Sequence, residues 1–222
     1  MGLFTDMAHF FTSRFGFLMH LVGTHMLLSV IVMLVAIVIA LPIGVLIGHL
    51  HRFSFVAINV GNVLRALPTP AIVAVVIGFY GLGFVNILIA LVILAVPLIL
   101  TNAYVGVAEV EPGIVQAARG MGLTGWQTVW RVELPNAVPL IMAGIRTAMV
   151  YVIATTYLAA LAGYTGTLGD IIFNQTEYRI DGILVAAVLS VVLAFLAELV
   201  LAVVERLLTS RGLRVSLVSA VV

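Results

Sequence analysis

The feature that most constrains this chain is a stretch without any charged side chain between Arg65 and Glu109. A helix needs about 20 apolar residues to cross the hydrocarbon core of a bilayer, so this stretch is long enough for two crossings. A Gly-Leu-Gly sequence at residues 81–83 can form the turn between them, because glycine adopts backbone conformations that other residues avoid. The sequence therefore predicts a helical hairpin inside a membrane.

The composition agrees with this prediction. Of the 222 residues, 64% are hydrophobic and 9% are charged, whereas about 25% of the residues of a soluble domain are charged. We therefore expect an all-α, polytopic membrane protein. The formal net charge of +1 includes no basic block, so nothing indicates a nucleic-acid partner. Cysteine and lysine are both absent, which excludes disulfides, thiolate metal sites and a P-loop, whose lysine binds phosphates.

Apolar runs predict about five transmembrane spans, at residues 21–50, 57–80, 85–107, 138–161 and 183–204. Residues 1–20 place several phenylalanines around Arg14, which is typical of a helix lying at the membrane interface, although an irregular tail is the alternative. A six-span alternative, in which residues 10–23 also cross, is weaker because that segment is short and charged. Residues 21–206 then form the transmembrane domain, and residues 207–222 form a cytoplasmic tail.

Two polar clusters interrupt the predicted spans. Residues 67–70 read Leu-Pro-Thr-Pro and should break a helix, because proline has no N–H to donate. Freed backbone groups in a bilayer are tolerated only where protein or a water-filled cavity receives them, so Thr69 is a candidate for lining a substrate path. Thr155, Thr156 and Tyr157 form the second candidate cluster. The alternative for the first cluster is a structural kink filled by a neighbouring helix. For the second cluster it is hydroxyls bonded to the backbone one turn back and an aromatic ring packed between helices.

Ionisable residues inside the predicted spans need an explanation, because charges at membrane depth are costly. For Arg146 we favour snorkelling or structural pairing over substrate contact. Glu198 lies eight residues before Arg206, about two helical turns away on the same face, which favours a structural role at the interface. Four histidines show no carboxylate at helical spacing and are interpreted as interface residues without metal: His20, His25, His49 and His51.

The longest polar interruption runs from Glu109 to Pro135 and is called the polar loop below. Pro112 after an acidic residue predicts the start of a first helix, because proline in the first turn loses no needed hydrogen bond. Gly120 and Gly122 predict its end, since glycine readily adopts the left-handed conformation that closes a helix.

A second helix in the polar loop is predicted from Thr124, which can form a capping box with Gln127, and Pro135 is expected to end it. Three apolar residues at helical spacing share one face of this helix: Trp126, Val129 and Trp130. That face either packs on the membrane domain of the same chain or docks to another protein, and the sequence leaves both alternatives open.

The polar loop resembles the cytoplasmic coupling loop of permease subunits of bacterial ABC importers of the binding-protein-dependent, type I family. Their signature is Glu-Ala-Ala, three residues, glycine, nine residues, isoleucine, one residue and Leu-Pro. The same spacing is kept here by Gln116, Ala117, Ala118, Gly122, Val132, Leu134 and Pro135. Two positions depart, because Gln116 replaces the glutamate and Val132 replaces the isoleucine. The resemblance extends from about Thr24 to Arg206.

This resemblance implies a type I ABC importer permease fold and a transporter subunit that is not itself an enzyme. It also implies three protein partners: a second permease of the same or a sister chain, an ATPase dimer that binds ATP and magnesium, and an extracytoplasmic substrate-binding protein. No cofactor is expected in this chain. The coupling residues carried over are Gln116, Ala117, Ala118, Gly120, Met121, Gly122, Leu134 and Pro135.

The arginines set the expected orientation in the bacterial inner membrane, because positive residues are enriched on the cytoplasmic side. With the polar loop in the cytoplasm, Arg14 and Arg179 fall outside, and the following arginines fall inside: Arg52, Arg119, Arg131, Arg206, Arg211 and Arg214. The N-terminus is then outside and the C-terminus is cytoplasmic.

Several short segments most resemble the osmoprotectant branch, whose permeases move glycine betaine, choline, carnitine or related quaternary amines. They are residues 118–122, 132–135, 143–148 and 169–170, whereas residues 162–169 depart from the more glycine-rich turn of that branch. A permease for methionine or another amino acid is the alternative. The faces of Tyr104, Tyr151 and Tyr157 can attract a quaternary ammonium weakly, or these rings simply pack between helices.

Two other classes of membrane protein fit less well. A secondary transporter needs an inverted repeat or paired intramembrane acids, and the spans offer Glu198 with no evident repeat. An intramembrane enzyme needs a nucleophile and a base at membrane depth, and no such pair occurs in any predicted span.

Overall fold

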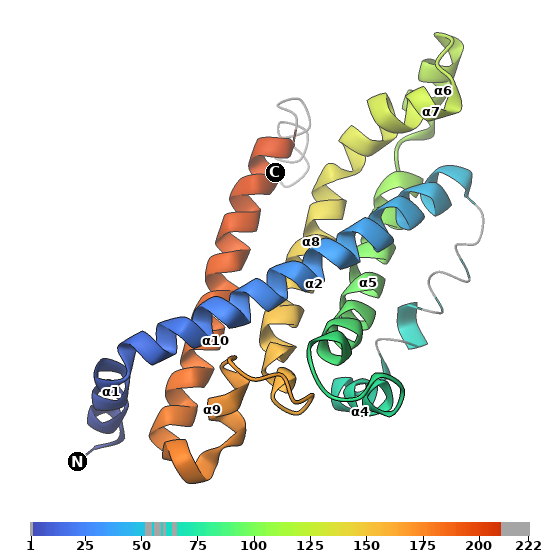
Figure 1. Ribbon diagram of the computed structural model, residues 1–222. Helices are drawn as coiled ribbons and strands as arrows, with labels where there is room; N and C mark the ends of the chain where they lie inside the picture. Colours follow the sequence, from blue (N-terminus) through green and yellow to red (C-terminus); the bar gives the residue numbers. More distant parts are fainter. Residues whose placement is uncertain (1, 52–54, 56–58, 60, 64–65, 210–222) are drawn as a thin grey trace.

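The structure, a computed structural model, describes residues 2–51, 55, 59, 61–63 and 66–209. Within these ranges every regular element is helical (Figure 1), which confirms the all-α prediction for this part of the chain. The elements are α1 (Leu3–Ser13), α2 (Phe15–Leu50), α4 (Thr69–Tyr80), α5 (Phe84–Ala108), α6 (Pro112–Gly120), α7 (Gly125–Thr128), the π-helix η1 (Val129–Glu133), α8 (Leu134–Thr155), the 3₁₀-helix η2 (Thr156–Ala159), α9 (Gly169–Phe173) and α10 (Gln175–Leu208).

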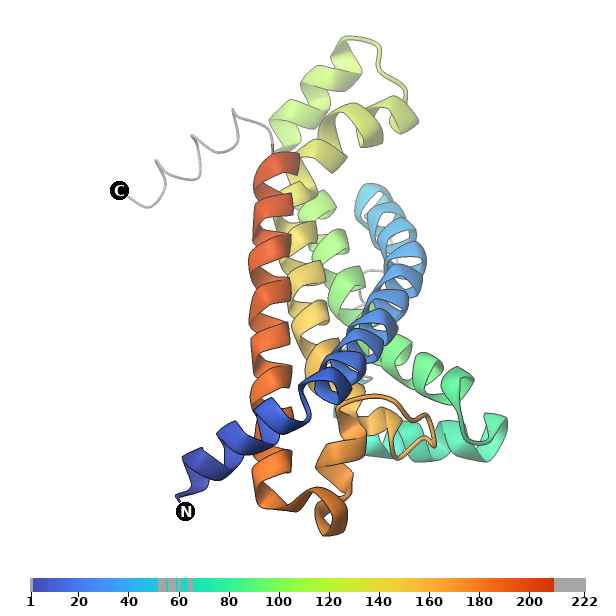
Figure 2. The same ribbon diagram turned by 60° about the vertical axis from the view of Figure 1, so that its left-hand side comes forward.

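Four described helical stretches are long and apolar enough to cross a membrane: Phe15–Leu50, Phe84–Ala108, Gly125–Ala159 and Gln175–Leu208. In Figure 2, α5, α8 and α10 run side by side, and α2 crosses them diagonally. α2 has 36 residues. At about 1.5 Å per residue it is about 54 Å long, much more than the ~30 Å hydrocarbon core, which accounts for its oblique path.

The predicted second span is not one continuous helix. α4 has 12 residues, so it is about 18 Å long and too short to cross a bilayer. It begins directly after Pro68, whose backbone is extended at ψ 125°, and this confirms the break predicted at residues 67–70. The earlier part of the predicted span includes Arg65 and other residues that lie outside the described ones.

Both ends of the transmembrane region differ from the predicted boundaries. α2 begins at Phe15 and not at residue 21, and Arg14 is the single residue between α1 and α2. The guanidinium of Arg14 lies 5.3 Å from the ring centre of Phe10 and 5.5 Å from that of Tyr178, so cation–π contacts hold this corner. α1 has 11 residues, about 16 Å, which does not support a sixth span. The last helix also starts early, at Gln175, and has a kink at residue 179, where φ is 52°.

Pro135 does not end the second helix of the polar loop, contrary to the prediction. α7, the π-helix and α8 follow one another without a break, and Pro135 lies in the first turn of α8. A proline normally clashes with the carbonyl four residues earlier. The preceding turn is a π-helix, whose hydrogen bonds span five residues and whose turn is wider, so the chain remains helical past the proline. The second helix of the polar loop and the fourth predicted span therefore form one continuous helical segment.

Small residues bring the backbones of α2, α5 and α8 close together, as is common between membrane helices. A Cβ added at Gly44 or Gly48 of α2 would lie 2.8 Å from a carbonyl oxygen of α5. A Cβ added at Gly144 of α8 would lie 2.6 Å from the Cβ of Asn102 in α5. These helices, with α4, enclose the main apolar core.

Candidate functional site

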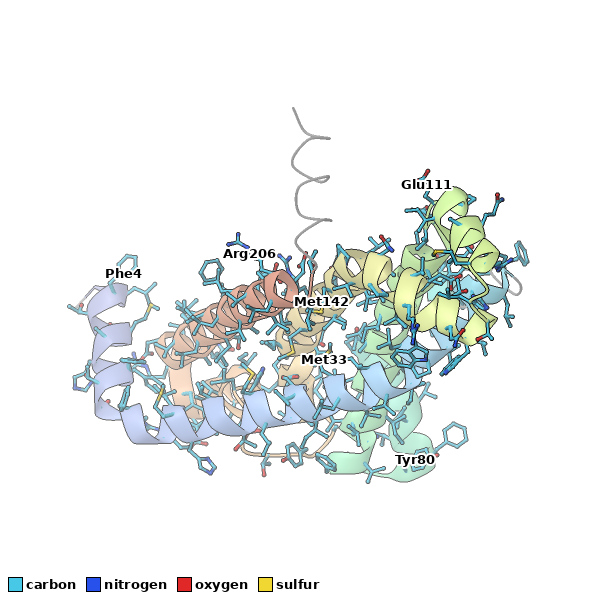
Figure 3. All side chains as sticks on the ribbon, turned by 90° about the horizontal axis from the view of Figure 1, so that it is seen from above. Phe4, Met33, Tyr80, Glu111, Met142 and Arg206 are labelled. Atoms are coloured by element: carbon cyan, nitrogen blue, oxygen red, sulfur yellow. The ribbon has the colours of Figure 1, made fainter. Side chains whose placement is uncertain are left out.

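The first helix of the polar loop projects from one end of the molecule, away from α1, α4 and α9 (Figure 1). Helix α6 begins at Pro112 and ends at Gly120, as predicted. The chain then turns at Gly122, whose φ of 85° favours glycine and whose N–H donates to the carbonyl of Arg119 at 2.9 Å. In Figure 3, Glu111 at the start of this helix points away from the rest of the molecule.

The predicted coupling residues divide into exposed and buried ones. Five side chains or glycine backbones are exposed on this short segment: Gln116, Ala117, Gly120, Met121 and Gly122. Ala118 is only 2% exposed, because α6 packs with this face against the second helix of the polar loop. In this structure Ala118 therefore permits close packing within the loop, and its predicted contact with an ATPase stays a prediction. Further along, Leu134 is half-buried and Pro135 is exposed.

The second helix of the polar loop starts at the predicted capping box. The backbone N–H of Thr124 donates to Gln127 Oε1 at 2.9 Å, and the N–H of Gln127 donates to Thr124 Oγ1 at 3.4 Å. The predicted apolar face splits into two parts. Val129 is buried against the protein's own core, whereas Trp126 and Trp130 are both exposed, with ring centres 5.6 Å apart in an edge-to-face arrangement.

A buried carboxyl group lies at the base of the polar loop. Glu133, the last residue of the π-helix, is 3% exposed. Its two oxygens lie 3.0 and 2.8 Å from Nδ1 of His49, in the last turn of α2. A carboxylate has only acceptors, so the hydrogen of this contact is on the imidazole. The pair joins the polar loop to a helix 84 residues earlier in the chain.

A charged cluster joins α8 to α10. Nε of Arg146 donates to Glu198 at 3.0 Å, Nη2 donates to the same carboxylate, and Nη1 donates to Glu205 at 2.6 Å. The three side chains are 30%, 32% and 24% exposed. Structural pairing of Arg146 was one of the predicted alternatives. The sequence placed Glu198 on the same helical face as Arg206, and it did not predict the contact of Glu198 with Arg146 in the preceding span.

Most of the predicted path residues bond to the protein itself. Thr155 and Thr156 each donate to a carbonyl four residues earlier, both at 2.7 Å, which is the structural alternative. Thr156 is buried, and its hydroxyl also lies 3.1 Å from that of Ser29 in α2. One turn earlier in α2, Nε2 of the buried His25 donates to the carbonyl of Ile153 at 3.0 Å. These bonds anchor the end of α8 to α2.

Tyr157 and Thr69 lie in different surroundings. The ring of Tyr157 is 5.6 Å from that of Phe173 and lines an open cavity of about 450 Å³ between α8 and α10. The rest of the lining is mainly apolar and includes Ser190. Thr69 is half-buried at the start of α4. The structure therefore does not bring the four predicted path residues into one site.

Comparison with known proteins identifies the family. The family described as "Binding-protein-dependent transport system inner membrane component" matches residues 40–210. The chain belongs to this permease family. It is 37% identical over 214 residues to the glycine betaine/carnitine/choline transport system permease protein OpuCB of Bacillus subtilis, covering 94% of this chain and 96% of the relative. It is 40% identical over 191 residues to the carnitine transport permease protein OpuCB of Listeria monocytogenes, covering 86% and 87%.

Solved structures support the same fold. The permease resembles a chain of the MetNI methionine ABC transporter in an inward-facing conformation, with a TM-score of 0.78 and 21% sequence identity. The match covers 89% of this chain and 99% of that chain. At this identity the likeness concerns the fold alone, and it confirms the predicted type I importer permease architecture.

The sequence did not predict the His49–Glu133 pair, nor that Glu205 belongs to the charged cluster around Arg146. One signal for Glu133 was available, because it follows Val129 by four residues and so shares its buried face. Its partner could not be found in the same way, since the two residues are far apart in the chain and only the tertiary packing of α2 brings them together.

Proposed function

We propose that this permease imports quaternary-ammonium osmoprotectants such as glycine betaine, carnitine or choline. The observation that carries the proposal is the relatives' agreement. OpuCB of B. subtilis, OpuCB of L. monocytogenes and the choline permease OpuBB of B. subtilis are 36–40% identical to this chain over most of their lengths, and all are named for these solutes. The exposed tyrosine Tyr151 and the half-buried Tyr157 supply aromatic faces of the kind that attract quaternary amines.

The polar loop is the proposed coupling loop to a separate ATPase, which binds ATP and magnesium. Its projection beyond the helical bundle and its exposed residues Gln116, Ala117 and Gly122 suit docking to a partner. A second permease completes the translocation path, and an extracytoplasmic binding protein delivers the solute. The polar loop and the end of α10 lie at the same end of the molecule, so both are assigned to the cytoplasm, with α1 on the outer side.

Methionine is the second candidate cargo, and the favouring observation is the fold shared with the MetNI permease. Because many solutes use one permease fold, a likeness at 21% identity carries less weight for cargo than relatives at 36–40% identity.

The test is solute uptake by proteoliposomes that contain this permease with its co-purified ATPase and its binding protein. Radiolabelled glycine betaine, choline, carnitine, methionine and proline are offered separately, with internal ATP or a non-hydrolysable analogue. We expect ATP-dependent accumulation of at least one quaternary amine and none with the analogue. ATP-dependent uptake of methionine alone would move the permease to the amino-acid importers. Uptake without ATP and without a co-purifying ATPase would contradict the importer assignment itself.

A further inference from the structure

The contact between His49 and Glu133 lies where the polar loop meets the membrane helices. We propose that these two residues are positioning residues that transmit movement of the polar loop to α2. This inference rests on the proposed coupling role of the loop. Contacts between the loop and an ATPase do not explain how a displacement of the loop reaches α2, and the inference concerns that step.

The burial of Glu133 makes its contact with His49 specific. A buried carboxyl group without a hydrogen-bond partner is strongly destabilising, so its position is fixed by the donor that it finds. Among the described residues, the structure records His49 Nδ1 as that donor, in contact with both oxygens. His49 itself lies in the last turn of α2, where the helix dipole favours a positive group. The two ends of the contact are therefore held on two different helices.

The same imidazole also lies against the start of the second helix of the polar loop. A Cβ added at Gly125 would be 3.4 Å from Nε2 of His49. One ring therefore lies beside the first residue of α7, and its Nδ1 binds the last residue of the π-helix. This segment cannot rotate or slide relative to α2 without breaking the contact at one of its ends.

Helix α2 can pass such a displacement on, because it is closely packed against α5. At Gly44 and Gly48 the two backbones leave no room for a Cβ, and close-packed interiors are hardly compressible. Without the His49–Glu133 contact, the polar loop remains attached to the bundle through its chain connection to α5 and through the continuous helix into α8. The π-helix in that connection is then free to bend, and α2 no longer follows the loop.

The test replaces both residues with leucine, so that no buried polar group is left without a partner. His49→Leu/Glu133→Leu removes the contact, and apolar replacement of both partners of such a pair is often neutral for stability. The control is His51→Asn/Glu109→Leu, which removes an imidazole and a carboxylate at two exposed positions at the same end of the molecule; asparagine tolerates the left-handed backbone of residue 51, whose φ is 51°. The swapped pair His49→Glu/Glu133→His tests rescue. Each variant is reconstituted with the ATPase and the binding protein, and solute uptake and ATP hydrolysis are measured together.

We expect the double leucine variant to assemble and hydrolyse ATP, while solute taken up per ATP falls at least about 5-fold, the low end of typical couplings between sites. The control should keep the parent ratio, and the swapped pair should recover part of it. An unchanged ratio in the double leucine variant would overturn the inference. So would a loss of uptake and hydrolysis in equal proportion to the loss of assembled complex, which would indicate a purely structural pair. Failure of the proposed function looks different, because the parent complex itself would then show no ATP-dependent uptake.

Discussion

Replacing Arg146 with methionine should destabilise the permease, because it leaves Glu198 and Glu205 together without their cation. Arg146 donates three hydrogen bonds to these carboxylates between α8 and α10. Removing one partner of a fully buried ion pair costs about 3–5 kcal/mol. The three side chains are 24–32% exposed and so not fully buried, and we expect a cost below that range, about 2–3 kcal/mol.

The measurement is thermal stability in detergent, followed as the fraction of monodisperse protein that remains after heating. A loss of about 2–3 kcal/mol corresponds to a midpoint lower by about 5–10 °C for a chain of this size. The triple variant Arg146→Met/Glu198→Gln/Glu205→Gln removes the unpaired charges and should return to within about 1 kcal/mol of the parent.

An exposed arginine supplies the control for this experiment. Arg179 is 83% exposed and its Nε lies 3.8 Å from Oδ1 of Asp181, too far for a hydrogen bond, so Arg179→Met should cost less than about 1 kcal/mol. The reasoning is refuted if Arg146→Met melts within a degree or two of the parent. It is also refuted if the triple variant is as unstable as the single one, since the cost would then come from lost packing and not from unpaired charge.

Two further predictions concern glycines. Gly122→Leu in the polar loop should lower uptake per ATP while leaving the protein in the membrane, whereas Gly81→Leu at the opposite end should not. Both glycines have positive φ (85° and 74°) and open space around them, so each leucine strains its own turn without a steric clash. Gly48→Leu should lower the midpoint of thermal unfolding through overpacking worth about 1–3 kcal/mol, because even its Cβ would lie 2.7 Å from that of Val107 in α5; an unchanged midpoint would refute close packing there.

Local sequence signals predicted those parts of the fold that depend on local chemistry. The third predicted span, residues 85–107, matches α5 at Phe84–Ala108, because an unbroken apolar run between polar ends leaves little choice of boundary. The capping box at Thr124 formed as predicted, since both of its hydrogen bonds lie within one helical turn.

The errors arise where a neighbouring element changes the local outcome. Pro135 should end a helix by local rules, but a π-turn before it removes the clash, and no propensity scale indicates that turn. The exposure of Gln116 and Ala117 follows from their place on α6, whereas the burial of Ala118 depends on how α6 folds back onto the second helix of the loop. Resemblance to a family motif carries residue types to positions, but it does not specify which of them face a partner.

The polar loop is attached to the bundle by its chain connections to α5 and α8 and by a side-chain contact with α2, and the difference explains why one contact can matter for coupling. Its connection to α8 is covalent and helical but passes through a π-turn, a widened element that is common at functional sites and accommodates bending. Its connection to α2 is a pair of side chains, the partly exposed His49 and the buried Glu133. If they separate, the carboxyl group of Glu133 is left without this partner, at a cost of about 1–3 kcal/mol. If a displacement of the loop requires less energy than separating this pair, α2 moves together with the loop. Because α2 packs closely against α5 at Gly44 and Gly48, α5 then moves with them.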